Sequence, residues 1–77
     1  MDQMSQDEIK THLMQTSEEF RRLAAEHAEY DQQIEALEAK HAVTSDDEIE
    51  EHRLKKLKLA AKDRMMEMLG QYKAQHA

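Results

Sequence analysis

The fold is decided by the stretch LMQTSEEFRRLAAEHAEYDQQIEALEAKH, which runs from Leu13 to His41. Its apolar and aromatic residues, with a few small or polar ones, recur at alternating spacings of three and four. These positions are Leu13, Thr16, Phe20, Leu23, His27, Tyr30, Ile34, Leu37 and His41. Such a repeat places its residues on one face of a helix and holds that face against a partner helix. The stretch therefore predicts a long helix packed along its length.

The start of this helix has two interpretations. Ile9 extends the row toward the N-terminus in the same phase. Thr16-Ser17-Glu18-Glu19 also has the pattern of a capping box, with Thr16 as the cap and Glu19 reaching back. Because Ile9 and Leu13 keep the phase of the row, we expect one continuous helix over about residues 6–41. A break near residue 16, with a fresh start at Ser17, is the alternative.

A second helix follows a short turn over about residues 42–45. Ser45-Asp46-Asp47-Glu48 reads as another capping box, with Ser45 as the cap, and predicts a helix over about residues 46–72. A short loop makes consecutive helices antiparallel. We therefore predict an all-α fold, an antiparallel two-helix hairpin that forms a single domain over residues 1–77.

The hairpin core combines the row of the first helix with an apolar stripe of the second. The expected core consists of Leu13, Phe20, Leu23, His27, Tyr30, Ile34, Leu37, Leu54, Leu57, Ala61, Met65, Met68 and Tyr72. Other apolar residues fall outside this core, and residues 1–15 overhang the second helix. We assign these residues to an oligomer interface: Ile9, Met14, Leu59, Met66 and Leu69.

The composition favours such an assembly. The chain has 77 residues, of which 36% are charged, and it has no Cys that could form a disulfide. A domain of this size buries only about 60% of the surface of its unfolded chain, and small domains usually need an additional source of stability. We expect a homo-oligomer, either a dimer or a tetramer, in the form of a four-helix bundle or a larger assembly.

The sequence predicts neither an enzyme nor a metal or cofactor site. It has no Cys nucleophile and no Gly-rich phosphate loop, and capping explains its Ser and Thr residues. His27 is interpreted as a core histidine. His41 and His52 flank the turn near several acids, but a turn of this kind supplies poorly the fixed geometry that a metal site needs. The acidic start and the lack of an apolar run favour a cytoplasmic protein without a membrane segment.

Basic residues are concentrated in the second helix. The basic strip consists of Arg53, Lys55, Lys56, Lys58 and Lys62. We expect most of its charge to be used inside the chain, with Lys58 near Asp31 or Glu29 and Lys62 near Glu26. The alternative is a surface for nucleic acid or an acidic partner. The net charge of −6 and the lack of aromatic residues in the strip disfavour nucleic acid.

The second helix, at LKKLKLAAKDRM over residues 54–65, resembles the YdcH-like family of small bacterial proteins. Two lysines, then Lys-Leu, then Lys-Asp and an aliphatic residue form that family's pattern. The matching residues are Lys55, Lys56, Lys58, Leu59, Lys62, Asp63 and Met65. The first helix fits the pattern Phe-x-x-Leu-x-x-x-His, and the positions that match are Phe20, Leu23 and His27, followed by Asp31 and Ile34.

The resemblance covers roughly residues 13–72 and departs from the family at Tyr30 and Ala61, where Leu is more usual. It implies a helical hairpin in the bacterial cytoplasm with no established activity, and it supplies no catalytic residues. It also implies a polar network among Lys58, Lys62, Asp63 and Asp31. Together these inferences predict a non-enzymatic, self-associating adaptor, with a nucleic-acid-associated module as the alternative.

Overall fold

A computed structural model describes residues 4–40 and 42–75 of the chain. It contains three helices, α1 (Gln6–Thr16), α2 (Glu18–Glu38) and α3 (Ser45–Gln75), and the described residues contain no strand. The expected all-α class is confirmed. The expected division into two helices is wrong, because the first predicted helix is two separate helices.

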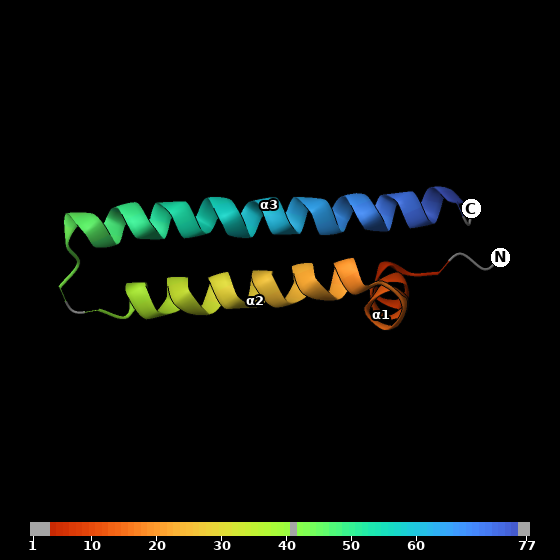
Figure 1. Ribbon diagram of the computed structural model, residues 1–77, viewed down its shortest axis with the longest axis horizontal. Coiled ribbons are helices and arrows are strands. Elements are labelled where there is room, and N and C mark those ends of the chain that lie inside the picture. Colours follow the sequence, from red (N-terminus) through yellow and green to blue (C-terminus); the bar gives the residue numbers. More distant parts are fainter. Residues whose placement is uncertain (1–3, 41, 76–77) are drawn as a thin grey trace.

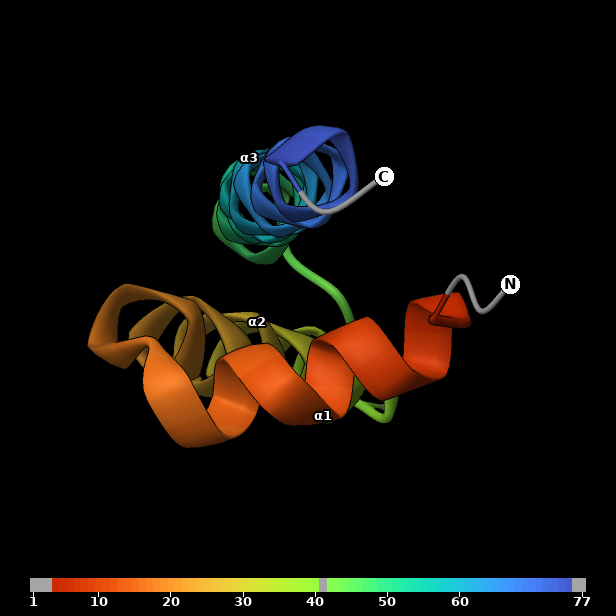
Figure 2. The same cartoon turned by 90° about the vertical axis from the view of Figure 1, so that its right-hand side faces the viewer.

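The three helices are arranged as a long antiparallel pair with a short crosspiece. α2 and α3 lie side by side and run in opposite directions (Figure 1). α1 lies crosswise at the end where α2 begins and contacts both of the longer helices (Figure 2). The first helix therefore does not overhang α3 as a straight extension of α2 but turns across the end of the pair.

The turn between α1 and α2 is made at a single residue, Ser17. Its backbone is extended, with φ −119° and ψ 115°. Its amide donates to the carbonyl of Leu13 over 2.8 Å and ends α1, while its hydroxyl accepts from the amide of Phe20 over 3.1 Å and caps α2. The Thr16 hydroxyl instead donates back to the carbonyl of His12 over 2.9 Å. The expected continuous helix and the expected Thr16 cap are both wrong, and the break predicted as the alternative is present.

α1 has its own capping box, which the sequence analysis did not single out. The amide of Glu8 donates to the hydroxyl of Ser5 over 3.2 Å, and the amide of Ser5 donates to the Glu8 carboxylate over 2.8 Å. These bonds satisfy free backbone groups at the helix start. The first bond satisfies an amide of the first turn, and both fix where α1 begins.

The start of α3 differs by one residue from the prediction. Thr44 is the cap, because its hydroxyl accepts from the amide of Asp47 and its own amide donates to the Asp47 carboxylate, both over 3.1 Å. The expected box of Ser45 and Glu48 is therefore wrong. α2 ends at Glu38 rather than near residue 41, and α3 continues past Gly70 to Gln75. His41, the last residue of the predicted row, lies outside the described residues.

All thirteen residues of the predicted core are buried or half-buried. The buried members are Leu13, Phe20, Leu23, Ile34, Leu54 and Ala61. The half-buried members are His27, Tyr30, Leu37, Leu57, Met65, Met68 and Tyr72. Each lies on the predicted face, so the register of α2 against α3 follows the apolar rows.

Two residues assigned to an oligomer interface lie in the core instead. Ile9 is 2% exposed and Leu69 is 3% exposed. They form one cluster with Leu13 and Phe20, against which Met68 packs. The assignment is wrong because it assumed a straight first helix, whereas α1 crosses the pair and buries these side chains within one chain. Met14, Leu59 and Met66 remain exposed, as expected.

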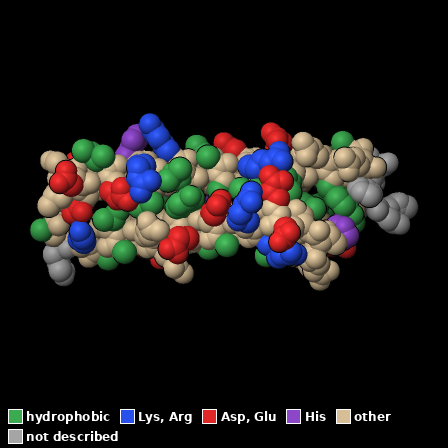
Figure 3. All heavy atoms as spheres, viewed as in Figure 1, with side chains coloured by type: hydrophobic (Ala, Val, Ile, Leu, Met, Phe, Trp, Pro, Cys, Tyr) green, Lys and Arg blue, Asp and Glu red, His purple; other side chains and the backbone are tan. Residues whose placement is uncertain are grey.

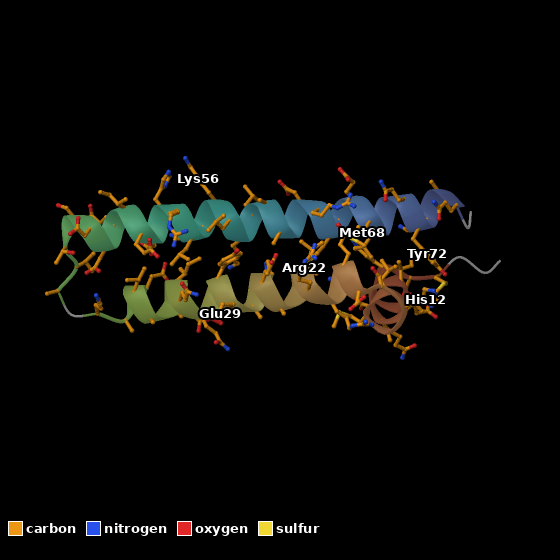
Figure 4. All side chains as sticks on the ribbon, viewed as in Figure 1. His12, Arg22, Glu29, Lys56, Met68 and Tyr72 are labelled. Atoms are coloured by element: carbon orange, nitrogen blue, oxygen red, sulfur yellow. The ribbon has the colours of Figure 1, made fainter. Side chains whose placement is uncertain are left out.

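Further contacts join the N-terminal part of the described chain to α3 at this crossing. The rings of His12 and Tyr72 lie 5.1 Å apart between centroids (Figure 4). The Tyr72 hydroxyl donates to the sulfur of Met4 over 3.7 Å. An isolated helix as short as α1 is marginal in water. Its stability therefore depends on the apolar and aromatic contacts that it makes with α2 and α3.

Replacing Ser17 by Ala removes the α2 cap, and we expect it to lower the free energy of unfolding by about 1 kcal/mol. Urea unfolding at a fixed protein concentration measures the loss. The matched control is Thr16→Ala, since Thr16 is exposed and its hydroxyl bonds only within α1; that change should stay within about 0.5 kcal/mol. A larger loss for Thr16→Ala than for Ser17→Ala would contradict this cap assignment.

Candidate functional site

The crossing of α1 over the helix pair creates a groove with a volume of about 390 Å³. All three helices contribute to it: α1 supplies one residue, α2 supplies one, and α3 supplies the rest. The lining residues are Lys10, His27, Lys58, Lys62, Met65, Met66 and Leu69. We call this feature the basic groove, because three of its residues are lysines and none is acidic.

The apolar part of the basic groove is continuous with the core. Leu69 belongs to the buried cluster beneath α1, and the half-buried Met65 packs against that cluster. Met66 is 46% exposed, and its sulfur accepts a hydrogen bond of 3.7 Å from the Gln6 side-chain amide. The groove therefore offers a sulfur-rich apolar surface beside the lysine side chains.

The lysines of the groove differ in how their charge is used. Lys58 pairs with Asp31 of α2, with 2.5 Å between its Nζ and the Oδ1 of the aspartate. Lys10 and Lys62 are exposed and make no ion pair within the described part of the chain. Two lysines without an ion pair in the described residues thus line the groove from different helices, α1 and α3.

The rest of the basic strip is not a continuous surface of free charge. Arg53 pairs with Glu50, and Lys55 lies 3.6 Å from both Glu38 and Glu51. Acidic and basic side chains accordingly lie next to each other over α2 and α3 (Figure 3). Lys56 points away from α2 (Figure 4) and has no ion pair among the residues described.

The expected ion pairs are confirmed only in part. Lys58 does reach Asp31. Lys62 does not pair with Glu26, and neither Lys62 nor Asp63 takes part in an ion pair in the described ranges, so the implied four-residue network is reduced to one pair. A different ion pair between α2 and α3, which the sequence analysis missed, is present as well.

That missed contact joins Arg64 of α3 to Glu19 in the first turn of α2. The Arg64 Nε lies 3.1 Å from the Glu19 carboxylate, and the guanidinium also binds Glu67 one turn later. Arg64 followed the strip in sequence as a further basic residue. Its partner depends on where α2 begins, which is fixed by the Ser17 cap.

Two of the ion pairs lower the pKa of the aspartate that takes part in them. The hydrogen bond from Lys58, supported by its charge, holds the pKa of Asp31 below its usual range. The hydrogen bond from Lys40, followed by that from the Thr44 amide, lowers the pKa of Asp47 at the start of α3. Both acids are therefore more firmly ionised in the folded chain than in the unfolded one.

Neither a metal site nor a membrane segment is found in residues 4–40 and 42–75. No three side chains of the metal-binding types His, Asp and Glu gather there closely enough to hold an ion. No helix in these ranges combines the length and the apolar character that crossing a membrane requires.

Comparison with known protein families identifies the family of the chain. A family described as a protein of unknown function, DUF465, matches residues 20–69. The chain belongs to this family. YdcH-like proteins are members of DUF465, so the resemblance inferred from the sequence is confirmed. Comparisons with curated proteins and with solved structures gave no match.

The DUF465 match divides the basic groove. The matched segment begins at residue 20. It therefore contains the groove residues of α2 and α3, including His27 and Lys62, but no residue of α1. Lys10 and the helix that carries it thus lie outside the matched segment. The groove is complete only when α1 is packed on the part of the chain that matches DUF465.

The lowered pKa of Asp31 predicts a specific dependence of stability on pH. Because the folded chain favours the ionised carboxylate, the stabilisation from Lys58 is present at neutral pH and is lost as the pH falls below about 4. The difference in melting temperature between the wild type and Asp31→Asn should therefore shrink as the pH is lowered from 7 toward 3.

The control variant is Glu35→Gln on the same helix, because Glu35 is exposed and has no side-chain partner among the described residues. Its melting temperature should follow that of the wild type over the same pH range. A constant difference between wild type and Asp31→Asn at all pH values would contradict the assigned role of the Lys58–Asp31 pair.

Proposed function

We propose that this chain is a non-enzymatic interaction protein, a helical adaptor that associates with further copies of itself. The observation that supports this proposal most strongly is the row of exposed apolar side chains on α3. Ile49 is 68% exposed, Leu59 is 56% exposed and Met66 is 46% exposed. We call these three residues the outer row.

The outer row follows the same helical repeat as the buried face of α3. Leu59 and Met66 are seven residues apart, as are the buried Leu54 and Ala61. Since a seven-residue step returns to almost the same side of a helix, each pair defines one face. The face with Leu54 and Ala61 is covered by the rest of the chain, and the face with Leu59 and Met66 is not.

A second copy of the chain suits the outer row. Lys56 and Asp63 flank Leu59, one on either side, and neither has an ion pair in the described part of the chain. If two α3 helices cross antiparallel near Leu59, Lys56 lies alongside Asp63 of the partner subunit, and the reverse pair forms by symmetry. Two apolar contacts and two opposite-charge pairs then arise from one interface.

The small core is a further argument for assembly. Only eight hydrophobic residues are buried in the described chain, and a chain of 77 residues without Cys has no disulfide to supplement them. Two α2–α3 pairs joined along α3 would form a four-helix bundle with α1 at each end. We propose a dimer as the basic unit, a tetramer as the larger assembly, and a location in the bacterial cytoplasm.

Nucleic-acid binding through the basic strip receives less support. Arg53, Lys55 and Lys58 have acidic partners, which leaves Lys56 and Lys62 as its unpaired members in the described ranges. Affinity for a phosphate backbone grows with the number of cations that neutralise it. Two separated lysines on a chain of net charge −6 provide little of that attraction.

Sedimentation velocity at micromolar concentrations tests the proposal. The wild type should sediment as a dimer or larger species. Leu59→Glu places a charge in the centre of the outer row and should weaken association by about tenfold or more. Circular dichroism should show unchanged helix content, because Leu59 is exposed in the single chain.

The matched control is Val43→Glu, which adds the same charge at a residue that is 51% exposed in the loop before α3. This variant should associate like the wild type. A wild-type chain that stays monomeric throughout the concentration range would refute the proposal. Equal weakening by both substitutions would refute the assignment of the interface to α3.

A further inference from the structure

We propose that the basic groove binds an acidic peptide segment of a partner protein, with an apolar side chain of the segment placed on the methionines. This inference goes beyond self-association, because the groove lies where α1 meets α3 and shares only Met66 with the outer row. It commits to a partner of one chemistry, a short stretch in which carboxylates alternate with leucine-like residues.

The charge of the groove is the first argument. The chain has 17 acidic and 11 basic residues, yet the lining of the groove contains lysines from two helices and no acid. Lys58 is held by Asp31, but Lys10 and Lys62 keep their charge free of any ion pair within the described chain. Two lysines that come to the groove from different helices fit two carboxylates that are spaced along a peptide.

The apolar surface of the groove is the second argument. Met65, Met66 and Leu69 line it together, and Met66 is 46% exposed. Methionine side chains adapt their shape to different apolar ligands and are common at surfaces that bind peptides. A volume of about 390 Å³ lies at the small end of ligand sites and gives room for a few side chains.

The same features argue against a nucleic acid in the groove. A phosphate backbone gains nothing from an apolar surface. No Phe, Tyr or Trp lines the groove, and the only ring in its lining, that of His27, is half-buried, which leaves little surface for a base to stack on. A polyanion is also repelled by the overall charge of −6, whereas a short segment with two or three carboxylates meets mainly the local field of the lysines.

Methionine methyl groups allow the site to be observed directly. The full-length chain is labelled with ¹³C-methyl methionine and titrated with the synthetic peptide Glu-Leu-Asp-Leu-Glu, blocked at both ends. The methyl signals of Met65 and Met66 should shift and saturate. Met14, which is exposed on α1 but does not line the groove, should not shift.

Charge reversal at the two unpaired lysines tests the proposed contacts. Lys10→Glu combined with Lys62→Glu should weaken peptide binding by about tenfold or more. The matched control is Lys73→Glu, an exposed lysine of α3 that neither lines the groove nor belongs to the outer row. Its affinity for the peptide should stay within about twofold of the wild type.

The variants also separate this inference from self-association. The doubly substituted chain should lose the peptide and keep its assembly in sedimentation velocity, while Leu59→Glu should lose assembly and keep the peptide. If the Lys10 and Lys62 substitutions leave peptide binding unchanged, the groove proposal fails, whatever the state of assembly.

Three further outcomes would overturn the proposal. Equal binding of Glu-Gly-Asp-Gly-Glu would show general charge attraction without the apolar contact. Tighter binding of decanoate at the same methyl groups would assign the groove to a small amphipathic carboxylate. The absence of a methyl shift with the leucine peptide at millimolar concentration would leave the groove without this ligand.

Discussion

The structure depends on the packing of α1 across the end of α2 and α3. Ile9 and Leu13 of α1, Phe20 of α2 and Leu69 of α3 form one buried cluster, and they account for half of the eight buried hydrophobic residues in the described chain. An eleven-residue helix has little stability of its own. Its apolar face must therefore be held by the longer helices, and in return it covers the end of their shared core.

Both candidate surfaces are consequences of this arrangement. Because α1 turns at Ser17, Lys10 comes to lie on the same groove as Lys62, although the two are far apart in the sequence. Because α1 lies across the end of the pair, Leu59 of the outer row stays exposed, whereas Met66 belongs both to the outer row and to the groove beside α1. The DUF465 match covers nearly all of α2 and most of α3 but not α1. The groove is therefore formed by residues inside the matched segment together with Lys10, which lies outside it.

The periodicity of the sequence predicted the α2–α3 pair and the Lys58–Asp31 contact, because spacing determines which residues share a face. It could not decide whether the axis turns at Ser17, since Ile9 and Leu13 fit the same phase in a straight or a broken helix. Leu69 was misassigned for the same reason: only a returning α1 can bury it. The capping box at Ser5 and Glu8 was a visible signal of where α1 begins, but it fits a straight helix and a broken one equally well.

Hydrogen exchange of the backbone amides of Ile9 to Leu13 tests the packing of α1 most directly. The account predicts that these amides are protected to a degree comparable with those of α2, because α1 unfolds only when its apolar contacts with Phe20 and Leu69 are lost. Exchange at the rate of an unstructured peptide, while α2 and α3 remain protected, would contradict it.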